Sequence, residues 1–365
     1  MVWPKPGIED LVAASHGGIN YAELEKLGIS PESIIDFSVS TNPFGPPPGI
    51  EKALSKASID CYPDSESTEF RKALSEKLNI SPDNLLIGSG STELIRMTAA
   101  VYFGPFDTVL IPQPTYSEYE ISSRLVGARV IKQQMKEETG FRLDVVETEA
   151  LVRRYRPKGI FLCNPNNPTG GYLSEKEFRE ILDIARDSLI IMDEAYASFV
   201  SEGWSTLGLV EQNNLIVIRS MTKDYALAGL RLGYLVAAKQ VISALRKVKP
   251  PWNVSSVAQQ AGIQALNSGE YIETCRTRIL EARQFLVEEL EKIGLKPLPS
   301  QANFFLVRTG DAVRFRSALL RKGILVRDCS SFGLPQYIRL APRSINECRK
   351  LISAIMGSGV LDHDS

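Results

Sequence analysis

The stretch "NLIVIRSMTKDYALAGLRLGYLVA", residues 214–237, decides the fold. Two short apolar runs, "NLIVI" and "LGYLVA", are joined by a glycine-containing segment that holds one lysine, Lys223. Runs that are apolar on both faces are typical of strands inside a largely parallel sheet. We therefore expect Lys223 to be buried or half-buried. Because burial disfavours the ammonium form, the amine is expected to act as a nucleophile toward a carbonyl carbon.

Similar runs recur along the chain, and their spacing is that of an α/β protein. They are "NLLIG" at 84–88, "DTVLIP" at 107–112, "GIFLCNP" at 159–165 and "SLIIMDE" at 188–194. Helical patterns lie between several of them. This alternation predicts a large domain with a mostly parallel sheet that is covered by helices.

A long amphipathic pattern, residues 269–293, follows this part of the chain and predicts one long helix. Beyond it, the runs "NFFLVR", "GILVRD" and "YIRLA" alternate with two helical patterns, which predicts a smaller α+β domain. We therefore expect residues 1–45 to form an N-terminal arm and part of the small domain. Residues 46–268 would form the large domain, and residues 269–365 the connecting helix and the rest of the small domain.

The composition excludes several classes of function. With 42 basic and 43 acidic residues, the net charge of -1 gives no overall field that would attract nucleic acid or an anionic membrane. The start "MVWPKPGIED" lacks the apolar core of a secretory signal, and no run approaches the roughly 18 apolar residues of a membrane span. We expect a soluble, cytoplasmic protein. Five cysteines without CxxC spacing indicate neither a disulfide framework nor a zinc site.

Histidine is too scarce for most histidine-based chemistry. The chain holds only His16 and His363, so a Ser-His-Asp hydrolase and a histidine-rich metal site are nearly excluded, and we expect no metal. Acid-base work is expected to fall to lysine, tyrosine or carboxylate groups. The polar tail around His363 is expected to be disordered.

Three polar residues follow or end predicted strands. Asn167 comes after "GIFLCNP", Asp193 ends "SLIIMD", and Lys223 lies just beyond "NLIVIRS". Taken singly, each has an ordinary explanation as a turn, a helix cap or a solvated strand end. Because the carboxyl ends of parallel strands meet at one edge of the sheet, where ligands bind, the three together predict one shared crevice.

The stretch "LLIGSGSTELI" has the pattern of a strand, a Gly/Ser turn and the start of a helix. Such a turn offers backbone N–H groups and the hydroxyls of Ser91 and Thr92 to an anion. It lacks both the Walker ending and the dinucleotide spacing, and a bare strand-to-helix turn is the alternative. Ser220 and Arg231 flank Lys223, however, so the pattern indicates a phosphate beside an amine.

In chain order, "PTYSEY", "NPNNPTG", "MDEAY", "SMTKDYALAGLRLGY" and "YIRLA" resemble the class I and II aminotransferases, which are fold-type I enzymes that use pyridoxal 5'-phosphate. The resemblance covers nearly the whole chain. It implies a large cofactor-binding domain, a smaller α+β domain and a homodimer. It also implies that Lys223 binds the cofactor aldehyde covalently.

The resemblance assigns further roles around the cofactor ring. Asp193 would pair with the pyridine nitrogen, and Tyr196 and Asn167 would hydrogen-bond the ring oxygen. Tyr116 would stack on the ring face. The catalytic residues would then be Lys223, Asp193 and Tyr196. Related enzymes have a cis peptide before the proline that follows this asparagine, so we expect the Asn167-Pro168 bond to be cis.

The cofactor phosphate would be held at the other end of the ring. The resemblance implies that its contacts are Ser91, Thr92, Ser220 and Arg231. Tyr62, in "CYPDS", would reach the phosphate of the neighbouring subunit in the homodimer. Thr222 stands where the family commonly has serine, and it keeps a hydroxyl.

Substrate recognition is expected to involve the small domain. Arg339 in "YIRLA" matches the family arginine that binds a substrate anion, and Arg327 in "LVRDCSSFG" lies nearby in the sequence; an ordinary surface charge is the alternative for Arg327. The stretches "HGGINYAELEKLG" and "VRDCSSFGLPQYIR" look most like the threonine-phosphate decarboxylases of cobamide synthesis. In that case His16 and Asn42 become candidate contacts to the substrate phosphate.

Three functions remain open at this point. The first choice is decarboxylation of L-threonine O-3-phosphate to (R)-1-aminopropan-2-yl phosphate. The alternative is a histidinol-phosphate aminotransferase of histidine biosynthesis, which passes the amino group to 2-oxoglutarate, or another class I or II aminotransferase. In either case the substrate bond held perpendicular to the cofactor ring is the one that breaks. A ligand-sensing domain without chemistry is the third hypothesis, and the intact Lys223, Asp193 and Arg339 argue against it.

Overall fold

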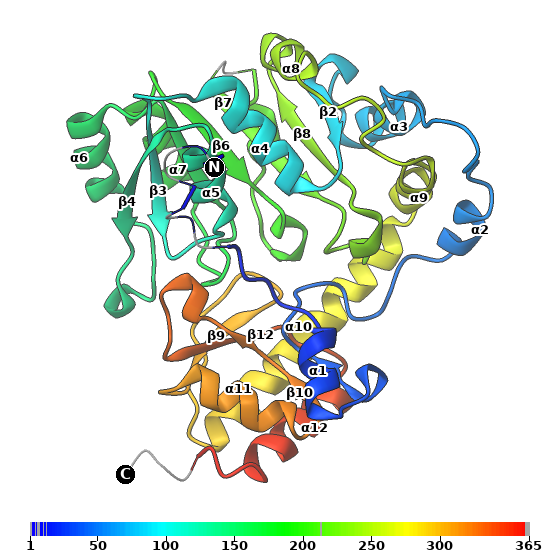
Figure 1. Ribbon diagram of the computed structural model, residues 1–365, viewed down its shortest axis with the longest axis vertical. Coiled ribbons are helices and arrows are strands. Elements are labelled where there is room, and N and C mark those ends of the chain that lie inside the picture. The colour runs from blue at the N-terminus through cyan, green and yellow to red at the C-terminus, as the bar shows by residue number, and fades with distance from the viewer. Residues whose placement is uncertain are drawn as a thin grey trace.

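The computed structural model describes residues 13–211 and 214–361, together with residues 2, 3, 5, 8, 9 and 11. His363 lies outside the described residues, so the expectation for the polar tail stays a prediction. Figure 1 shows a large, mostly parallel sheet with helices around it, and a smaller group of strands and helices below.

Seven strands form the large sheet, in the order β2-β8-β7-β6-β5-β3-β4. Their bounds are β2 (Leu85–Gly88), β3 (Thr108–Gln113), β4 (Arg129–Gln134), β5 (Gly159–Cys163), β6 (Leu189–Asp193), β7 (Leu215–Ser220) and β8 (Gly233–Ala237). The strands β3 to β7 pair in parallel, whereas β8 is antiparallel to both of its neighbours. The predicted mostly parallel sheet is confirmed. The apolar runs did not indicate the edge strand β4, "RVIKQQ", because four of its six residues are polar or charged.

The sheet is buried on both faces, which explains its unbroken apolar runs. In β5, Ile160 and Leu162 pack into one hydrophobic cluster, while Phe161 between them packs into another. Successive side chains of a strand point to opposite faces, so the two clusters lie on opposite sides of the sheet. The covering helices are α2 (Ile50–Leu54), α3 (Thr68–Leu78), α4 (Ser91–Tyr102), α5 (Glu118–Leu125), α6 (Val145–Tyr155), α7 (Glu175–Ile184), α8 (Lys239–Arg246) and α9 (Ser256–Leu266).

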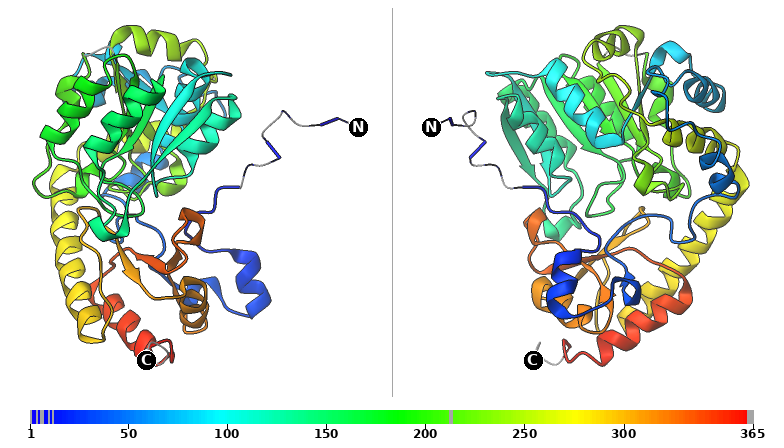
Figure 2. Two further views of the ribbon diagram at one scale, coloured as in Figure 1. Left: turned by 90° about the vertical axis from the view of Figure 1, so that its left-hand side faces the viewer. Right: turned by 45° about the vertical axis from the view of Figure 1, so that its right-hand side comes forward.

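The long helix α10 (Gly269–Lys292) confirms the expected amphipathic helix and runs alongside both parts of the molecule (Figures 1 and 2). Below the large sheet lies a three-stranded antiparallel sheet in the order β11-β12-β9. Its strands are β9 (Phe305–Arg308), β11 (Arg327–Asp328) and β12 (Tyr337–Leu340). The helices α11 (Ala312–Leu320) and α12 (Ile345–Met356) belong to this part of the chain.

The N-terminal segment contributes to the smaller part. The strand β1 (Ile35–Asp36) pairs in parallel with β10 (Ile324–Leu325), and α1 (Tyr21–Leu27) precedes it. The expected strand "GILVRD" is split into β10 and β11, which pair with different partners. The division of the chain after residues 45 and 268 remains our proposal. No helix in the described ranges is both long and apolar enough to cross a membrane.

Candidate functional site

The three polar strand-end residues come together. Asp193 is the last residue of β6, Asn167 follows β5, and Lys223 follows β7, and these three strands are neighbours in the sheet. All three side chains line one cavity of about 360 Å³. The chain therefore builds the shared crevice that the strand-end pattern predicted.

Most of the other predicted site residues line the same cavity. They are His16, Ser91, Thr92, Tyr116, Tyr196, Arg231, Arg327 and Arg339. The cavity is lined by residues of the large domain and by Arg327 and Arg339 of β11 and β12, and these two strands belong to the smaller sheet that lies below the large one in Figure 1. The roles of these residues stay proposals, and three predicted residues lie elsewhere.

Asn42 supports the main chain beside Lys223 and does not face the cavity. Its side-chain amide donates to the carbonyl oxygen of Asp224 at 3.0 Å, and its Oδ1 accepts from the N–H of Phe44 at 3.0 Å. The N–H of Asn42 also donates to the carbonyl oxygen of Lys223 at 2.7 Å. Both ends of the side chain are thus in use. These bonds give Asn42 a structural role at the lysine loop, and its contact with a substrate phosphate stays a prediction.

Ser220 also lies outside the cavity lining, whereas Thr222 belongs to it. The hydroxyl oxygens of Ser220 and Thr222 are 2.7 Å apart, so Ser220 contacts the cavity lining only through the Thr222 side chain in this hydrogen bond. Tyr62 is 77% exposed and stacks on Trp252 with ring centroids 4.3 Å apart. The Tyr62 ring is therefore accessible to another molecule. Its contact with a second subunit remains a proposal.

The Lys223 side chain is largely buried and lies near the guanidinium groups of two arginines. Burial, together with the guanidinium groups of Arg339 and Arg231, lowers the pKa of Lys223 to about 8, and Asp193 opposes the shift. An amine with this pKa is roughly one-fifth neutral at pH 7.4, whereas an ordinary lysine is almost wholly protonated there. The Lys223 amine can therefore attack an aldehyde carbon or accept a proton.

The rate at which Lys223 captures added pyridoxal 5'-phosphate should rise with pH and level off above about pH 8. Only the neutral amine attacks, so below that pH the rate should fall about tenfold per pH unit. Stopped-flow absorbance of the cofactor-free protein checks this, with Lys223→Arg as a control that cannot react. A rate that keeps rising until the usual lysine value of 10.5 would contradict the assignment.

Asp193 is a buried carboxylate with two protein donors. The hydroxyl of Tyr119 donates to Oδ2 at 2.8 Å, and the N–H of Ala195 donates to Oδ1 at 2.9 Å. Burial raises the pKa of Asp193, these two donors oppose the rise, and the net value is about 6. Tyr119 was absent from the predicted site residues. The signal was present, since Tyr119 is the second tyrosine of "PTYSEY".

Aromatic rings and an amide frame the middle of the cavity. The hydroxyl oxygen of Tyr116 lies 3.0 Å from that of Thr92. Tyr196 is buried, and its ring meets Phe304 edge to face at 4.8 Å. The Asn167-Pro168 peptide bond is cis, as expected. A flat aromatic ligand can therefore lie against Tyr116 with polar groups at its edge.

One end of the cavity is built for an anion. Helix α4 begins at Ser91, and its N-cap residue, Gly90, supplies no side-chain hydrogen bond to the free N–H groups of the first turn. Gly90 has φ 80°, and a Cβ there would lie 2.9 Å from Nη2 of Arg231. A Cβ on Gly233 would lie 3.0 Å from the backbone nitrogen of Ser91. The two glycines thus let the turn, β8 and the guanidinium approach closely, which suits a phosphate group.

Arg339 is buried with an incomplete set of partners. Its Nη1 donates to Oδ1 of Asn167, and its Nη2 donates to the carbonyl oxygen of Ser38 at 2.8 Å. Within the described ranges its buried Nε finds no hydrogen-bond partner. A guanidinium with an unsatisfied donor beside Lys223 is well suited to a ligand anion.

Arg327 is only 7% exposed, which rules out the surface-charge explanation. Its Nη2 donates to the carbonyl oxygen of Ser15 and to Oγ of Ser331, both at 2.7 Å. Its Nη1 donates to Oγ of Ser15 at 3.2 Å. Arg327 therefore ties the N-terminal segment to the smaller sheet at the cavity. The His16 ring, in the same segment, lies 5.9 Å from the Tyr116 ring.

The lining of this cavity carries an excess of positive charge. Its four cationic side chains are those of Lys223, Arg231, Arg327 and Arg339, and Asp193 is the carboxylate among the described lining residues. A ligand set with several negative charges fits this lining. The residues present fit pyridoxal 5'-phosphate, because the anion end, the aromatic wall, the carboxylate and the amine occur together.

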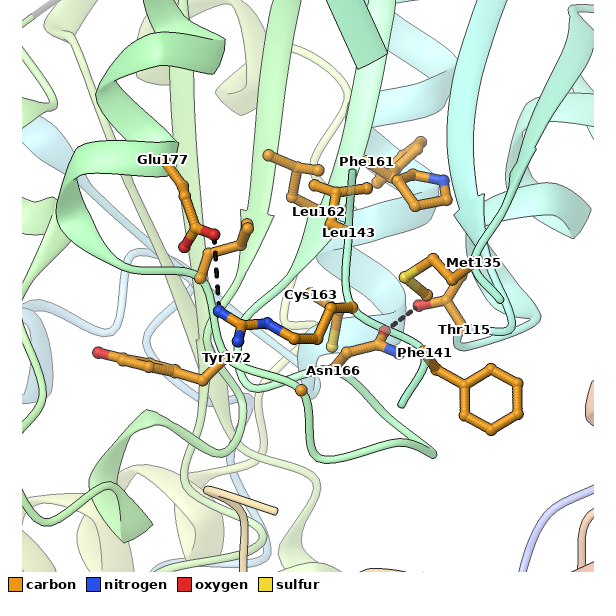
Figure 3. Close-up of a pocket in the computed structure, with 14 residues that line it drawn as sticks. Thr115, Met135, Phe141, Leu143, Phe161, Leu162, Cys163, Asn166, Tyr172 and Glu177 are labelled. Carbon is orange, nitrogen blue, oxygen red and sulfur yellow. Dashed lines mark hydrogen bonds and ion pairs between the residues drawn. The ribbon is translucent and has the colours of Figure 1, made fainter. Parts of the chain in front are cut away.

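A second cavity lies behind the "NPNNPTG" loop and is much smaller, at about 40 Å³ (Figure 3). Its apolar lining includes Met135, Phe141 and Leu143, and Cys163 lines both cavities. The charged pair Arg142 and Glu177 lies at 3.7 Å among its lining residues. This volume is too small for a cofactor, whereas the larger cavity is lined by most of the predicted site residues.

Comparisons with known proteins agree with this geometry. A family model described as aminotransferase class I and II matches residues 32–355. The chain is 34% identical over 328 residues to a histidinol-phosphate aminotransferase from Symbiobacterium thermophilum, covering 88% of this chain and 90% of that protein.

Two solved structures are also similar. The histidinol-phosphate aminotransferase from Clostridium acetobutylicum has a TM-score of 0.81 at 28% identity, covering 89% of this chain and 98% of that one. The L-threonine-O-3-phosphate decarboxylase from Porphyromonas gingivalis has a TM-score of 0.76 at 26% identity, covering 87% of this chain and 96% of that one.

Proposed function

Because the chain belongs to the class I and II aminotransferases, which use pyridoxal 5'-phosphate, we propose that it transfers the amino group of histidinol phosphate to 2-oxoglutarate. The observation that carries the proposal is the presence of two separate cationic groups around Lys223. Arg231 stands beside the start of α4, whereas Arg327 and Arg339 come from β11 and β12. One group suits the cofactor phosphate, which leaves the other for an anion on the substrate.

The sequence alone favoured decarboxylation of threonine phosphate, and that preference is less well supported than the alternative. Relatives named as histidinol-phosphate aminotransferases match the chain at 34% identity in sequence and at a TM-score of 0.81 in structure. The decarboxylase structure matches at 26% identity and a TM-score of 0.76. We therefore place transamination first.

Four charged residues of the cavity would have a task in such a reaction. The bound cofactor supplies an electron sink for charge that develops at the substrate α-carbon. Asp193 would hold the proton on the ring nitrogen, and Lys223 would move a proton at the α-carbon. Arg339, whose Nε has no partner among the residues that the structure describes, would bind the substrate anion. The segment tied down by Arg327 would limit access of water.

Decarboxylation of L-threonine O-3-phosphate is the second candidate, and a specific contact favours it. Arg327 joins Ser15, next to the "HGG" stretch, to Ser331 of "RDCSSFG". These are the two stretches that resemble the decarboxylases. An arginine that anchors the substrate phosphate would let the carboxylate turn out of the ring plane, and the carboxylate bond would then be the one that breaks.

Incubation of the loaded enzyme with each substrate and 2-oxoglutarate decides between the two candidates. Glutamate formed from histidinol phosphate, with no carbon dioxide from threonine phosphate, is the expected result. Carbon dioxide from threonine phosphate, with no glutamate from histidinol phosphate, would instead support the decarboxylase. The two candidate reactions differ in which substrate bond is held perpendicular to the cofactor ring. The Lys223→Ala protein supplies the background for both assays. Absence of both products would overturn both candidates.

A further inference from the structure

A buried tyrosine, Tyr119, connects the carboxylate of the cofactor site to its aromatic wall. Its hydroxyl donates to Oδ2 of Asp193 at 2.8 Å, and its ring meets that of Tyr116 edge to face at 5.6 Å. We propose that Tyr119 is a positioning residue, which fixes the orientation and the charge of the Asp193 carboxylate that holds the cofactor ring nitrogen. The proposal rests on the cofactor part of the proposed function and is independent of the substrate.

The placement of Tyr119 is rigid. The residue lies in the first turn of α5, is fully buried, and its ring stacks on Phe161 with centroids 5.0 Å apart and planes 7° apart. Phe161 in turn is held inside the sheet by β5. Packing against Phe161 and Tyr116 therefore fixes the phenol oxygen of Tyr119 beside Asp193. Little side-chain conformational entropy is lost when the hydrogen bond forms.

The two donors act on different oxygens of the carboxylate. Tyr119 holds Oδ2 and the N–H of Ala195 holds Oδ1, so the group cannot rotate without losing a hydrogen bond. A carboxylate offers about four acceptor positions, which leaves positions for a ring N–H. The carboxylate lines the cavity and is thus aimed before the cofactor arrives.

The hydroxyl also favours the charged form of Asp193. Burial raises the pKa of this carboxyl group and Glu194 raises it too, whereas Tyr119, Ala195 and Lys223 lower it. A hydrogen bond from a hydroxyl to a carboxylate is charge-assisted and stronger than a neutral one. Loss of the hydroxyl would therefore weaken the hold of Asp193 on a protonated ring nitrogen.

The test uses Tyr119→Phe, which keeps the stacked ring and removes the hydroxyl. Affinity for pyridoxal 5'-phosphate is expected to fall about tenfold, as for loss of a hydrogen bond to a charged group. The nitrogen-15 shift of ring-labelled cofactor should move toward the unprotonated form. Tyr337→Phe is the matched control, because Tyr337 is another buried tyrosine, donates to Glu137 and lies outside the cavity lining. It should change neither quantity.

A merely structural tyrosine would give different results. If Tyr119 acts through Asp193, adding Tyr119→Phe to an Asp193→Asn protein should cost no further affinity, since the pair acts as one unit. Additive losses, or an unchanged nitrogen-15 shift in Tyr119→Phe, would overturn the proposal. If the phenylalanine variant does not fold, Tyr119→His, whose ring N–H can donate, should keep the wild-type shift. A shift toward the unprotonated form in that variant would also count against it.

These measurements need the cofactor alone and no substrate. A negative result for Tyr119 is therefore distinguishable from a negative result for the proposed transamination. The product assays with wild-type protein report on the substrate. The affinity and nitrogen-15 measurements report on the link between Tyr119 and Asp193.

Discussion

Replacement of Lys223 by alanine is expected to lower turnover by at least roughly a thousandfold. The side chain follows β7 at the cavity, and its pKa of about 8 leaves it able both to attack a carbonyl carbon and to carry a proton. No other lysine is among the described residues that line this cavity. The variant therefore loses a nucleophile and an acid-base group at once.

Turnover and mass spectrometry after borohydride reduction measure the two losses separately. Wild-type protein should carry one covalent cofactor at Lys223, and Lys223→Ala should carry none there. Lys223→Arg is the matched control, since it keeps a positive charge without a usable nucleophile, and it should be as inactive as the alanine variant. Activity retained in either variant would end the assignment of Lys223.

Replacement of Asp193 by asparagine is expected to lower kcat/KM by about a thousandfold. A carboxylate at about 4 Å from a ring N–H, with an effective dielectric near 20, is worth roughly 4 kcal/mol. At 1.36 kcal/mol for each factor of ten, this is about three orders of magnitude. Asparagine keeps the shape and an acceptor oxygen but removes the charge. The effect should therefore come from electrostatics, with little change in packing.

Steady-state kinetics and the absorbance of the bound cofactor test this prediction. The covalent link to Lys223 should still form in Asp193→Asn, because the amine is unchanged. Asp193→Glu is the matched control, since it keeps the charge in a shifted place, and it should retain more activity than the asparagine variant. A loss smaller than tenfold in Asp193→Asn would show that ring protonation does not depend on this carboxylate.

The sequence by itself determined the buried strands of the large sheet and the strand-end residues of the site. Runs such as that of β5 are apolar at every position because both faces of the strand are buried. A polar residue that ends or follows such a run must then lie at the end of its strand. For this reason the local pattern alone indicated Asn167, Asp193 and Lys223 at the carboxyl ends of three neighbouring strands. The long helix α10 was found for the same reason, since its periodicity is local.

Only the tertiary structure decided which polar groups pair. Asn42 binds the carbonyl oxygen of Asp224, 182 residues away, and Tyr119 binds Asp193, 74 residues away. Arg327 reaches Ser15 across 312 residues. Local periodicity specifies which face of an element is buried, but a hydrogen bond needs donor and acceptor within about 3 Å at a good angle. That distance is set by how distant elements pack together. The hydrogen bonds of Asn42, Tyr119 and Arg327 therefore became visible only in the folded chain.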